Sequence, residues 1–185
     1  MAKFILLDRD GVINRRGPGG YVTSWAEFEF LDGALEGIRL LTQHDYAPIV
    51  VSNQACVAKG LLTASGLAEI TGRFVEAVAR NGGRIHDVYY CTHRKEDGCE
   101  CKKPKPGLLL KAQREHSFSF PATFLIGNSE TDLQAAQAVG CPAVLISDSA
   151  PVHRQRLAHP LLGVFRDLYT AAQFILGLGS NPQIN

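Results

Sequence analysis

The sequence lacks any long hydrophobic run and carries almost no net charge. No apolar stretch approaches the roughly 18 residues that a membrane-spanning helix needs, and Met1-Ala2-Lys3 leads into a short apolar segment rather than a signal peptide. The formal net charge of +1 gives no reason to expect a nucleic acid or a membrane as partner. We therefore expect a soluble, cytoplasmic protein, monomeric in the simplest case.

Repeats, internal linkers and a disulfide framework are also missing. The 185 residues include five cysteines, and three of them cluster with a histidine, which argues against paired cysteines. A chain of this length with 45% hydrophobic residues can form one domain with a sizeable core. We predict a single domain over residues 1–176 and a flexible tail over residues 177–185.

Strand-like and helix-like segments alternate along the chain, which is typical of a parallel sheet covered by helices. Strands are predicted near residues 4–7, 47–51, 88–91, 123–126, 143–146 and 164–165. Helices are predicted near residues 34–44, 65–78, 108–115, 130–139 and 168–176. The expected fold class is α/β, a Rossmann-like parallel sheet with helices on both faces. Ligands of such sheets bind at the carboxyl ends of the strands.

Two carboxylates follow the first predicted strand. Asp8 and Asp10 stand two residues apart after Phe4-Ile5-Leu6-Leu7, so both point to the same side where the strand unwinds. One carboxylate can act as a nucleophile and form an aspartyl-phosphate, while the other protonates the leaving oxygen and later activates water. Asp8 suits the first role and Asp10 the second. The alternative is a polar exit from a strand into a turn.

A phosphoryl-transfer site of this kind needs cations, because two carboxylates and a phosphate repel one another. One source is the segment 102–107, where prolines stiffen the backbone and Lys103 is the candidate catalytic cation. The other is Mg²⁺, which binds carboxylates, phosphate and water. A lysine-rich segment is also an ordinary solvated surface, and that interpretation suits Lys105 better than Lys103.

Polar residues also end the second predicted strand. Ser52 and Asn53 offer a hydroxyl and an amide to the oxygens of a phosphoryl group, although a Ser-Asn pair is common in loops. Candidate contacts for a substrate's hydroxyls or second phosphate are Asn53, Gln54, Lys59 and Arg16. The alternative for each of them is an ordinary solvated side chain.

Four soft or borderline metal ligands occur within one segment of eleven residues. They are Cys91, His93, Cys99 and Cys101, a set that fits a closed tetrahedral Zn²⁺ site. No ligand position remains for water, so the zinc is expected to be structural and to fold a loop that has little apolar content of its own. The alternative is a redox-active or coincidental cysteine cluster.

Four motifs occur in a fixed order along the chain: Asp8-x-Asp10-Gly11, Val51-Ser52-Asn53-Gln54, Lys103-Pro104 and Gly127-Asn128-x-x-x-Asp132. They resemble the motifs of haloacid-dehalogenase-type phosphatases, and the zinc loop narrows the resemblance to a small branch with a minimal cap. The resemblance implies that Ser52 holds the phosphate. It also implies that Asp8, the backbone carbonyl of Asp10, Asn128 and Asp132 bind Mg²⁺.

The branch that the chain resembles contains phosphatases of heptose 1,7-bisphosphate and of histidinol phosphate. Residues 20–33 and 103–109 look more like the first group. The resemblance therefore implies Mg²⁺-dependent hydrolysis of the 7-phosphate of the heptose bisphosphate, a step toward bacterial surface polysaccharide. Histidinol phosphate is the alternative substrate, and a catalytically silent sugar-phosphate-binding module is the alternative from another class.

Two residues depart from the pattern of this family. Asn128 stands where the family usually has an aspartate ligand of Mg²⁺. An amide oxygen can coordinate Mg²⁺ but brings no negative charge, so the ion is expected to bind more weakly. Lys102 stands where an arginine usually precedes the motif lysine, and it is expected to contact the substrate without the bidentate fork that arginine offers to phosphate.

Overall fold

Six parallel strands form one sheet at the centre of the computed structural model, which describes residues 3–147 and 161–177. The strands are β1 (Lys3–Leu7), β2 (Tyr46–Asn53), β3 (Asp87–Cys91), β4 (Phe124–Gly127), β5 (Ala143–Ile146) and β6 (Leu161–Phe165). The α-helices are α1 (Ala34–Gln43), α2 (Ala64–Arg80), α3 (Gly107–His116), α4 (Glu130–Ala138) and α5 (Leu168–Ile175). Three short 3-10 helices are η1 (Pro18–Gly20), η2 (Trp25–Glu27) and η3 (Phe120–Ala122).

Each predicted strand and helix is present, and the differences lie at the ends of the elements. The difference that matters most for the site is at β2, which continues two residues beyond the prediction. Ser52 and Asn53 remain in parallel register with Tyr90 and Cys91 of β3. The backbone of these two candidate site residues is therefore fixed by the sheet.

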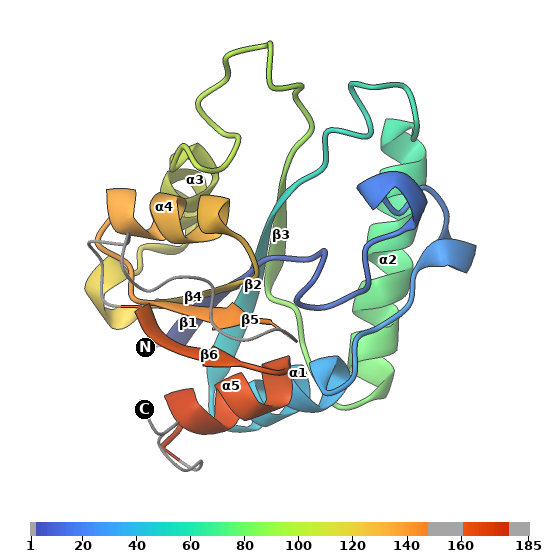
Figure 1. Ribbon diagram of the computed structural model, residues 1–185. Helices are drawn as coiled ribbons and strands as arrows, with labels where there is room; N and C mark the ends of the chain where they lie inside the picture. The colour runs from blue at the N-terminus through green and yellow to red at the C-terminus, as the bar shows by residue number, and fades with distance from the viewer. Residues whose placement is uncertain (1–2, 148–160, 178–185) are drawn as a thin grey trace.

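The side chains of β1 alternate between two hydrophobic cores. Ile5 and Leu7 belong to the core beneath α1, α2 and α5, whereas Leu6 belongs to the core beneath α3 and α4. This alternation is the two-residue period of a strand. Figure 1 shows α3 and α4 on one side of the sheet and α1 and α5 on the other. The predicted α/β class, with helices on both faces, is confirmed.

Helix α2 illustrates how the local sequence places a helix. The hydroxyl oxygen of Thr63 accepts a hydrogen bond from the backbone amide of Gly66 at 3.0 Å, which caps the helix start. Its buried stripe consists of Leu67, Ile70, Phe74 and Val78. These are the positions that the helical period predicts as core.

The strand order in the sheet is β3-β2-β1-β4-β5-β6. From β1 the chain adds β2 and β3 on one side and then β4, β5 and β6 on the other, so the order switches between β1 and β4. Open α/β sheets bind ligands at this point, outside the carboxyl ends of the strands. The two longest segments that leave the sheet there are residues 8–33 and 92–106, seen above the sheet in Figure 1. Neither contains a helix longer than three residues. The cap over this edge is therefore minimal, as predicted.

Two further predictions concern the C-terminal end of the chain, which the structure describes only as far as residue 177. Residues 178–185 of the predicted tail lie outside the described residues, so the flexibility of the tail and the domain boundary at residue 176 stay predictions. Within residues 3–147 and 161–177, no helix is both long enough and apolar enough to cross a membrane.

Candidate active site

Asp8 and Asp10 lie at the carboxyl end of β1, on the wall of a cavity of about 430 Å³ that we call the catalytic cavity. The backbone amide of Asp8 donates to the carbonyl of Ile126 at 2.9 Å, so the pairing of β1 with β4 extends to Asp8. Gly11 then turns the chain with φ of +93°, and a Cβ atom there would overlap the side-chain amide of Asn128. The turn requires glycine and brings the first and last motifs together.

Lys103 is the buried cation of the catalytic cavity, with only 3% of the residue exposed. Its Nζ lies 3.0 Å from Oδ1 of Asp8, and it donates to Oδ1 of Asp132 at 2.6 Å and to the carbonyl of Val51 at 2.8 Å. Burial by itself lowers the pKa of Lys103, but the charges of Asp132 and Asp8 raise it above its ordinary value. The ammonium therefore stays protonated between its two carboxylates.

The end of β2 holds the backbone of Lys103 and contributes to the cavity wall. The side chain of Asn53 donates from Nδ2 to the carbonyl of Lys103 and accepts from the amide of Lys103, both at 3.0 Å. Ser52 is 1% exposed and lines the same cavity. The predicted contacts of Ser52 and Asn53 with phosphate or substrate stay predictions, whereas the clamp on Lys103 is a contact that we did not predict.

Asp132 is fully buried, and donors of the protein engage both of its carboxylate oxygens. Oδ1 accepts from Lys103. Oδ2 accepts from the amides of Asn128 and Ser129 at 3.1 Å each, and from the Ser129 hydroxyl at 2.6 Å. Burial by itself raises the pKa of Asp132, but Lys103 and these hydrogen bonds bring it below its ordinary value. The contacts favour a role in holding Lys103, and Mg²⁺ binding by Asp132 stays a prediction.

Oδ1 of Asn14 and Oδ1 of Asn128 are buried and accept no hydrogen bond from the described residues, whereas the partner of Oδ1 of Asp8 is the Lys103 ammonium at 3.0 Å. Burial raises the pKa of Asp8, and the charge of Lys103 offsets this only in part. Buried polar atoms without partners cost free energy, and carboxylate and amide oxygens are ligands that Mg²⁺ accepts. Asp8 and Asn128 therefore fit a magnesium ion.

Three side chains hold Asp10. Gln54 donates from Nε2 to Oδ2 at 2.6 Å, Asn14 donates to Oδ1 at 2.8 Å, and Arg9 donates from Nη2 to both oxygens at 3.0 and 3.2 Å. Gln54 is fully buried, and its Oε1 accepts from Arg9 at 3.0 Å. These contacts favour the orientation of Asp10 as a role of Gln54, and the substrate contact that we predicted for Gln54 stays a prediction.

Arg9 and Asn14 are site residues that the sequence analysis missed. Arg9 is the largest fully buried side chain among the described residues, and its guanidinium lies 5.7 Å from the centre of the Tyr90 ring. Burial by itself lowers the pKa of Arg9, but the charge of Asp10 raises it above its ordinary value. One signal was available, because a charged residue between two aspartates at the end of an apolar strand needs a buried partner.

The remaining predicted substrate contacts differ in their relation to the catalytic cavity. Arg16 lines it. Lys59 donates to the hydroxyl of Tyr21 at 3.0 Å, and Tyr21 lines the cavity, so Lys59 is linked to the cavity through that ring. Lys102 donates to the carbonyl of His93 at 3.2 Å in the Cys/His loop. Of these three cations, Arg16 is the one on the cavity wall.

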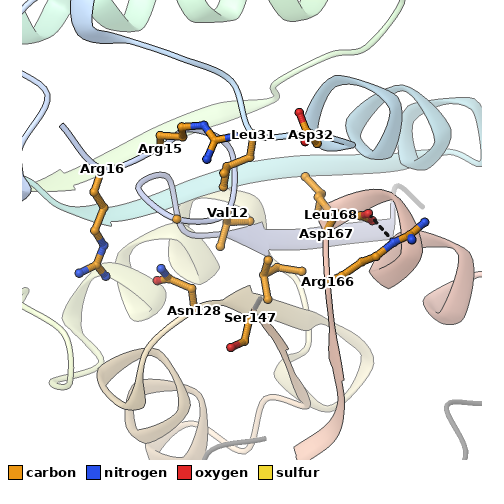
Figure 2. Close-up of a pocket in the computed structure, with 12 residues that line it drawn as sticks. Val12, Arg15, Arg16, Leu31, Asp32, Asn128, Ser147, Arg166, Asp167 and Leu168 are labelled. Atoms are coloured by element: carbon orange, nitrogen blue, oxygen red, sulfur yellow. Dashed lines mark hydrogen bonds and ion pairs between the residues drawn. The ribbon is translucent and has the colours of Figure 1, made fainter. Parts of the chain in front are cut away.

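A second cavity, of about 780 Å³, adjoins the catalytic cavity at Arg16, which lines both. Figure 2 shows Arg16 and Arg166 on opposite sides of it. Arg166 pairs with Asp167 at 3.0 Å. We did not predict this cavity, because its walls come from segments at both ends of the chain, which meet only in the folded sheet.

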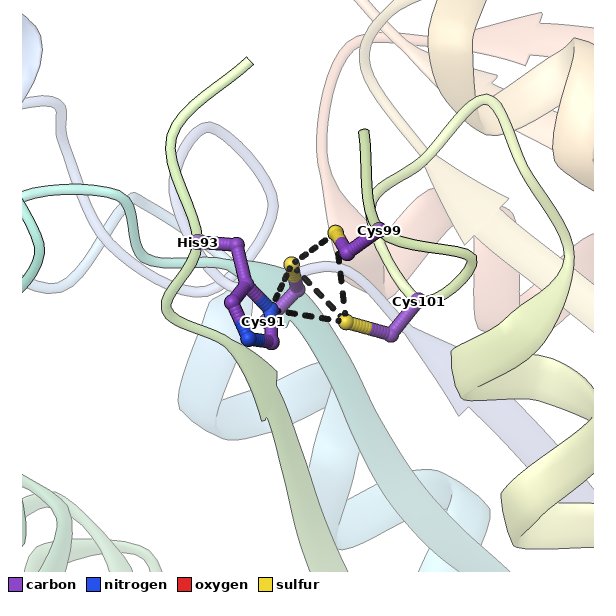
Figure 3. A group of neighbouring side chains, drawn as sticks. All are labelled: Cys91, His93, Cys99 and Cys101. Carbon is purple, nitrogen blue, oxygen red and sulfur yellow. Dashed lines mark hydrogen bonds between the residues drawn. The ribbon is translucent and has the colours of Figure 1, made fainter. Parts of the chain in front are cut away.

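The four predicted zinc ligands gather at the end of β3 (Figure 3). They are Cys91, His93, Cys99 and Cys101, and their ligand atoms all lie within 4.8 Å of one another. The three sulfur atoms are 3.1, 3.5 and 3.6 Å apart, and the cysteines form no disulfide. Zinc–sulfur bonds of about 2.3 Å in a tetrahedron separate the sulfurs by about 3.8 Å. The side chains therefore fit a metal ion, and zinc is the metal that we propose below.

Comparison with known proteins agrees with this arrangement. Residues 100–170 match a family model described as "HAD-hyrolase-like". The chain is 32% identical to the D-glycero-beta-D-manno-heptose-1,7-bisphosphate 7-phosphatase of Neisseria meningitidis serogroup A, over 98% of each chain. It is 34% identical to the enzyme of that name from Pseudomonas aeruginosa, over 93% of this chain and 97% of the relative.

A solved structure gives the same result for the fold. The D,D-heptose 1,7-bisphosphate phosphatase of B. bronchiseptica, crystallised with magnesium and phosphate, superposes with a TM-score of 0.84 at 31% identity. The match covers 95% of this chain and 98% of the other. Because the likeness extends over nearly the full length of these relatives, the chain belongs to the haloacid-dehalogenase-like phosphatase family that they represent.

Proposed function

We propose that the protein is a phosphoric monoester hydrolase that removes the 7-phosphate of D-glycero-D-manno-heptose 1,7-bisphosphate. The observation that carries the proposal is the convergence of Asp8, Asp10 and Lys103 on one cavity at the carboxyl edge of the sheet. The substrate is suggested by the relatives that match the chain almost from end to end. A small-molecule partner also suits an open cavity beneath a minimal cap.

Asp8 is the proposed nucleophile. One of its carboxylate oxygens bonds to phosphorus while the bond from phosphorus to the sugar oxygen breaks, which leaves an aspartyl-phosphate. Lys103 lies 3.0 Å from Asp8 and stabilises the negative charge on the transferring group. Because Asp132 and Val51 hold Lys103 in place, this positive charge is already oriented before the substrate arrives.

Asp10 is the proposed general acid and base. It gives a proton to the departing sugar oxygen, and in the second step it takes a proton from a water molecule. The oxygen of that water bonds to phosphorus, which breaks the bond to Asp8 and releases phosphate with a free carboxylate. Arg9, Gln54 and Asn14 keep the side chain of Asp10 oriented through both steps.

Magnesium is the proposed cofactor of this site, and the residues that would hold it are Asp8, the backbone carbonyl of Asp10 and Asn128. When bound, Mg²⁺ neutralises the phosphoryl oxygens and helps to align them. The carboxylate of Asp8 and the unpartnered amide oxygen of Asn128 support this assignment, because both are oxygen donors of the kind that Mg²⁺ accepts. Asp132 is a weaker candidate ligand, because its oxygens already accept hydrogen bonds from the protein.

Zinc is the proposed occupant of the Cys91, His93, Cys99 and Cys101 cluster. Four protein ligands leave no position for water, so the ion is structural. Its effect is to hold residues 91–101, which lead directly into the segment of Lys102 and Lys103. A cytoplasmic location and a monomeric state stay predictions.

Phosphate release from the purified protein with Mg²⁺ tests the proposed function. Heptose 1,7-bisphosphate and histidinol phosphate are compared, and an Asp8→Asn variant is the control, because its amide is not a nucleophile while its shape is nearly unchanged. We expect faster release from the bisphosphate and no release in the variant, with an unchanged circular dichroism spectrum. Preference for histidinol phosphate would overturn the substrate, and an active variant would overturn the nucleophile.

A further inference from the structure

The guanidinium of Arg9 has more hydrogens than its contacts with Asp10 and Gln54 use. Nε donates to Oδ1 of Asp10 at 3.2 Å, and Nη2 donates to both oxygens of Asp10 and to Oε1 of Gln54. Nη1 is buried and has no hydrogen-bond partner among the described residues. A guanidinium carries five N–H donors, and a buried donor without an acceptor costs free energy. The two hydrogens on Nη1 therefore need an acceptor beside them.

Tyr90 is a neighbour of Arg9 that can supply this acceptor. The guanidinium carbon of Arg9 lies 5.7 Å from the centre of the Tyr90 ring. Burial lowers the pKa of Arg9, whereas Asp10 and then the phenol of Tyr90 raise it. Burial in turn raises the pKa of Tyr90, and the charge of Arg9 opposes this in part. The two side chains are thus close enough to act on each other electrostatically.

The hydrogen bonds beyond Tyr90 leave its oxygen able to accept. The hydroxyl of Thr71 on α2 donates to the carbonyl of Leu67 at 2.7 Å, which uses its one hydrogen. The hydroxyls of Thr71 and Tyr90 are 3.0 Å apart, so Tyr90 must be the donor in that contact. A hydroxyl that donates can still accept. The lone pairs of the Tyr90 oxygen are therefore available to Nη1 of Arg9.

The backbones of Tyr90 and Thr71 are fixed by the elements that carry them. Tyr90 belongs to β3 and is in parallel register with Ser52 at the end of β2. Thr71 is on α2, where the neighbouring Ile70 lies in the core against which Tyr90 also packs. A hydrogen bond from Arg9 to Tyr90 would therefore connect the guanidinium to a paired strand and a packed helix.

We propose that Tyr90 is a positioning residue for the reaction, because its hydroxyl oxygen accepts from Nη1 of Arg9 and its hydroxyl hydrogen ties the pair to Thr71 of α2. Arg9 thereby keeps its donors on both oxygens of Asp10 while Asp10 gives up a proton and takes one back. Without this tie the guanidinium can turn away, and Asp10 delivers its proton from a less fixed orientation. The inference rests on the proposed function, in which Asp10 is the general acid and base.

The leaving group provides the test, because a general acid matters most when the departing oxygen is strongly basic. A sugar alkoxide needs a proton to leave, whereas p-nitrophenolate leaves without one. The ratio kcat/KM includes only the steps up to the departure of the leaving group, so it separates the role of Asp10 as an acid from its later role as a base. For each protein, kcat/KM is measured with heptose 1,7-bisphosphate and with p-nitrophenyl phosphate.

Tyr90→Phe is compared with Tyr89→Phe, which removes one hydroxyl from the neighbouring residue of the same strand. Tyr89 packs in the core on the other face of the sheet, where its hydroxyl donates toward Asp87 and Glu115. Because a hydrogen bond to a charged group is lost, we expect Tyr90→Phe to lower kcat/KM for the bisphosphate about tenfold. The value for p-nitrophenyl phosphate should stay nearly unchanged, and Tyr89→Phe should match the wild type with both substrates.

Two variants of Thr71 sharpen the result. Thr71→Ser keeps the hydroxyl and should behave like the wild type, whereas Thr71→Val removes the acceptor of Tyr90 and should lower kcat/KM for the bisphosphate by a smaller factor. Equal values in the two phenylalanine variants, or an equal loss with both substrates in Tyr90→Phe, would overturn the inference and leave the proposed function intact. A wild-type protein that releases no phosphate from the bisphosphate, or an Asp10→Asn variant as active as the wild type, would overturn the proposed function and the inference with it.

Discussion

The catalytic cavity and the Cys/His cluster both gather charged or ligating groups, but they are held together differently. In the cavity, Lys103 and Asp132 contact each other, the carbonyl of Val51 on β2 and the amide of Asn128 in the loop before α4. In the cluster, the four side chains chiefly contact one another. Residues 93–98 of the same loop are exposed.

We therefore expect the geometry of the cavity to depend on protein contacts and that of the cluster to depend on its proposed zinc ion. The cavity is built on strand ends of a sheet with cores on both faces, so its geometry is set when the domain folds. The loop of the cluster buries little apolar surface, so a metal ion must supply most of the free energy that orders it. Removal of metal should therefore leave the first site nearly intact and disrupt the second.

The largest expected effect comes from breaking the ion pairs of the cavity. Lys103→Met leaves Asp8 and Asp132 buried without their cation, which should lower the free energy of unfolding by about 3–5 kcal/mol. Phosphate release should fall by about a hundredfold or more, because the oriented charge at the phosphoryl group is lost. Urea denaturation and phosphate release measure the two effects.

Lys105→Met is the matched control for that change. Lys105 is exposed and pairs with Glu100 at 2.7 Å, and such surface pairs contribute about 0–1 kcal/mol. A Lys103→Met protein as stable as this control would show that the cavity does not depend on its buried ion pairs.

The next effect concerns the cluster. Cys99→Ser should lower the zinc content after dialysis from one ion per chain to a small fraction, because serine is a much poorer zinc ligand than a thiolate. Trypsin should then cut the loop of residues 93–98 faster, while the circular dichroism of the sheet and helices stays the same. Atomic absorption and timed proteolysis are the measurements.

Cys141→Ala is the control for zinc content. Cys141 is buried outside the cluster, and its Sγ donates to the carbonyl of Thr123 at 3.0 Å. Equal zinc content in both cysteine variants would refute the assignment of the cluster.

A smaller effect is expected at Asn128, which is a proposed ligand of Mg²⁺. Asn128→Asp adds a negative charge at an oxygen that has no hydrogen-bond partner among the described residues, so Mg²⁺ should bind about tenfold more tightly. Calorimetric titration with Mg²⁺ measures this without substrate. Asn81→Asp, on an exposed residue at the end of α2, should leave Mg²⁺ binding unchanged, and an equal affinity in the wild type and Asn128→Asp would reject the prediction.

The smallest expected effect is a loss of stability at low pH that comes from His86 and not from metal. It matters as a control, because acid is often used to remove metal ions from proteins. Burial and the charges of His116 and Arg84 lower the pKa of His86 below its ordinary value of 6.5. The stability that neutral His86 contributes is complete above that value and is lost as the pH falls through the pKa of the folded state.

Melting temperatures at about pH 7.5 and about pH 5.5 test this control. The wild type should lose a few degrees more than His86→Gln on acidification, whereas the exposed His44→Gln should behave like the wild type. An identical acid response in all three proteins would contradict the role of His86.

Several parts of the fold and site were predictable because their signals are local. Asp8 and Asp10 follow an apolar strand at a two-residue spacing, and the four proposed zinc ligands lie within eleven residues. The contacts of Asn53 and Gln54 were not predictable, because their partners are 50 and 44 residues away in the chain. Strand β2 also extended further than predicted, since pairing with β3 overrode a Ser-Asn pair that is common in loops.

The order of strands and helices, the two carboxylates after β1 and the grouping of Cys91, His93, Cys99 and Cys101 could be predicted from the sequence, because periodicity and short spacing act along the chain. The sequence also singled out Lys103 and Arg16 as cations of the site, but the partners of these cations and the presence of Arg9 followed from the tertiary structure. It buried Arg9 beneath Asp10, placed Lys103 between two aspartates and left Arg16 without a partner at the junction of two cavities. The reason is physical: the pairing of a buried charge depends on which groups the packed sheet brings within a few ångströms, whatever their separation in sequence.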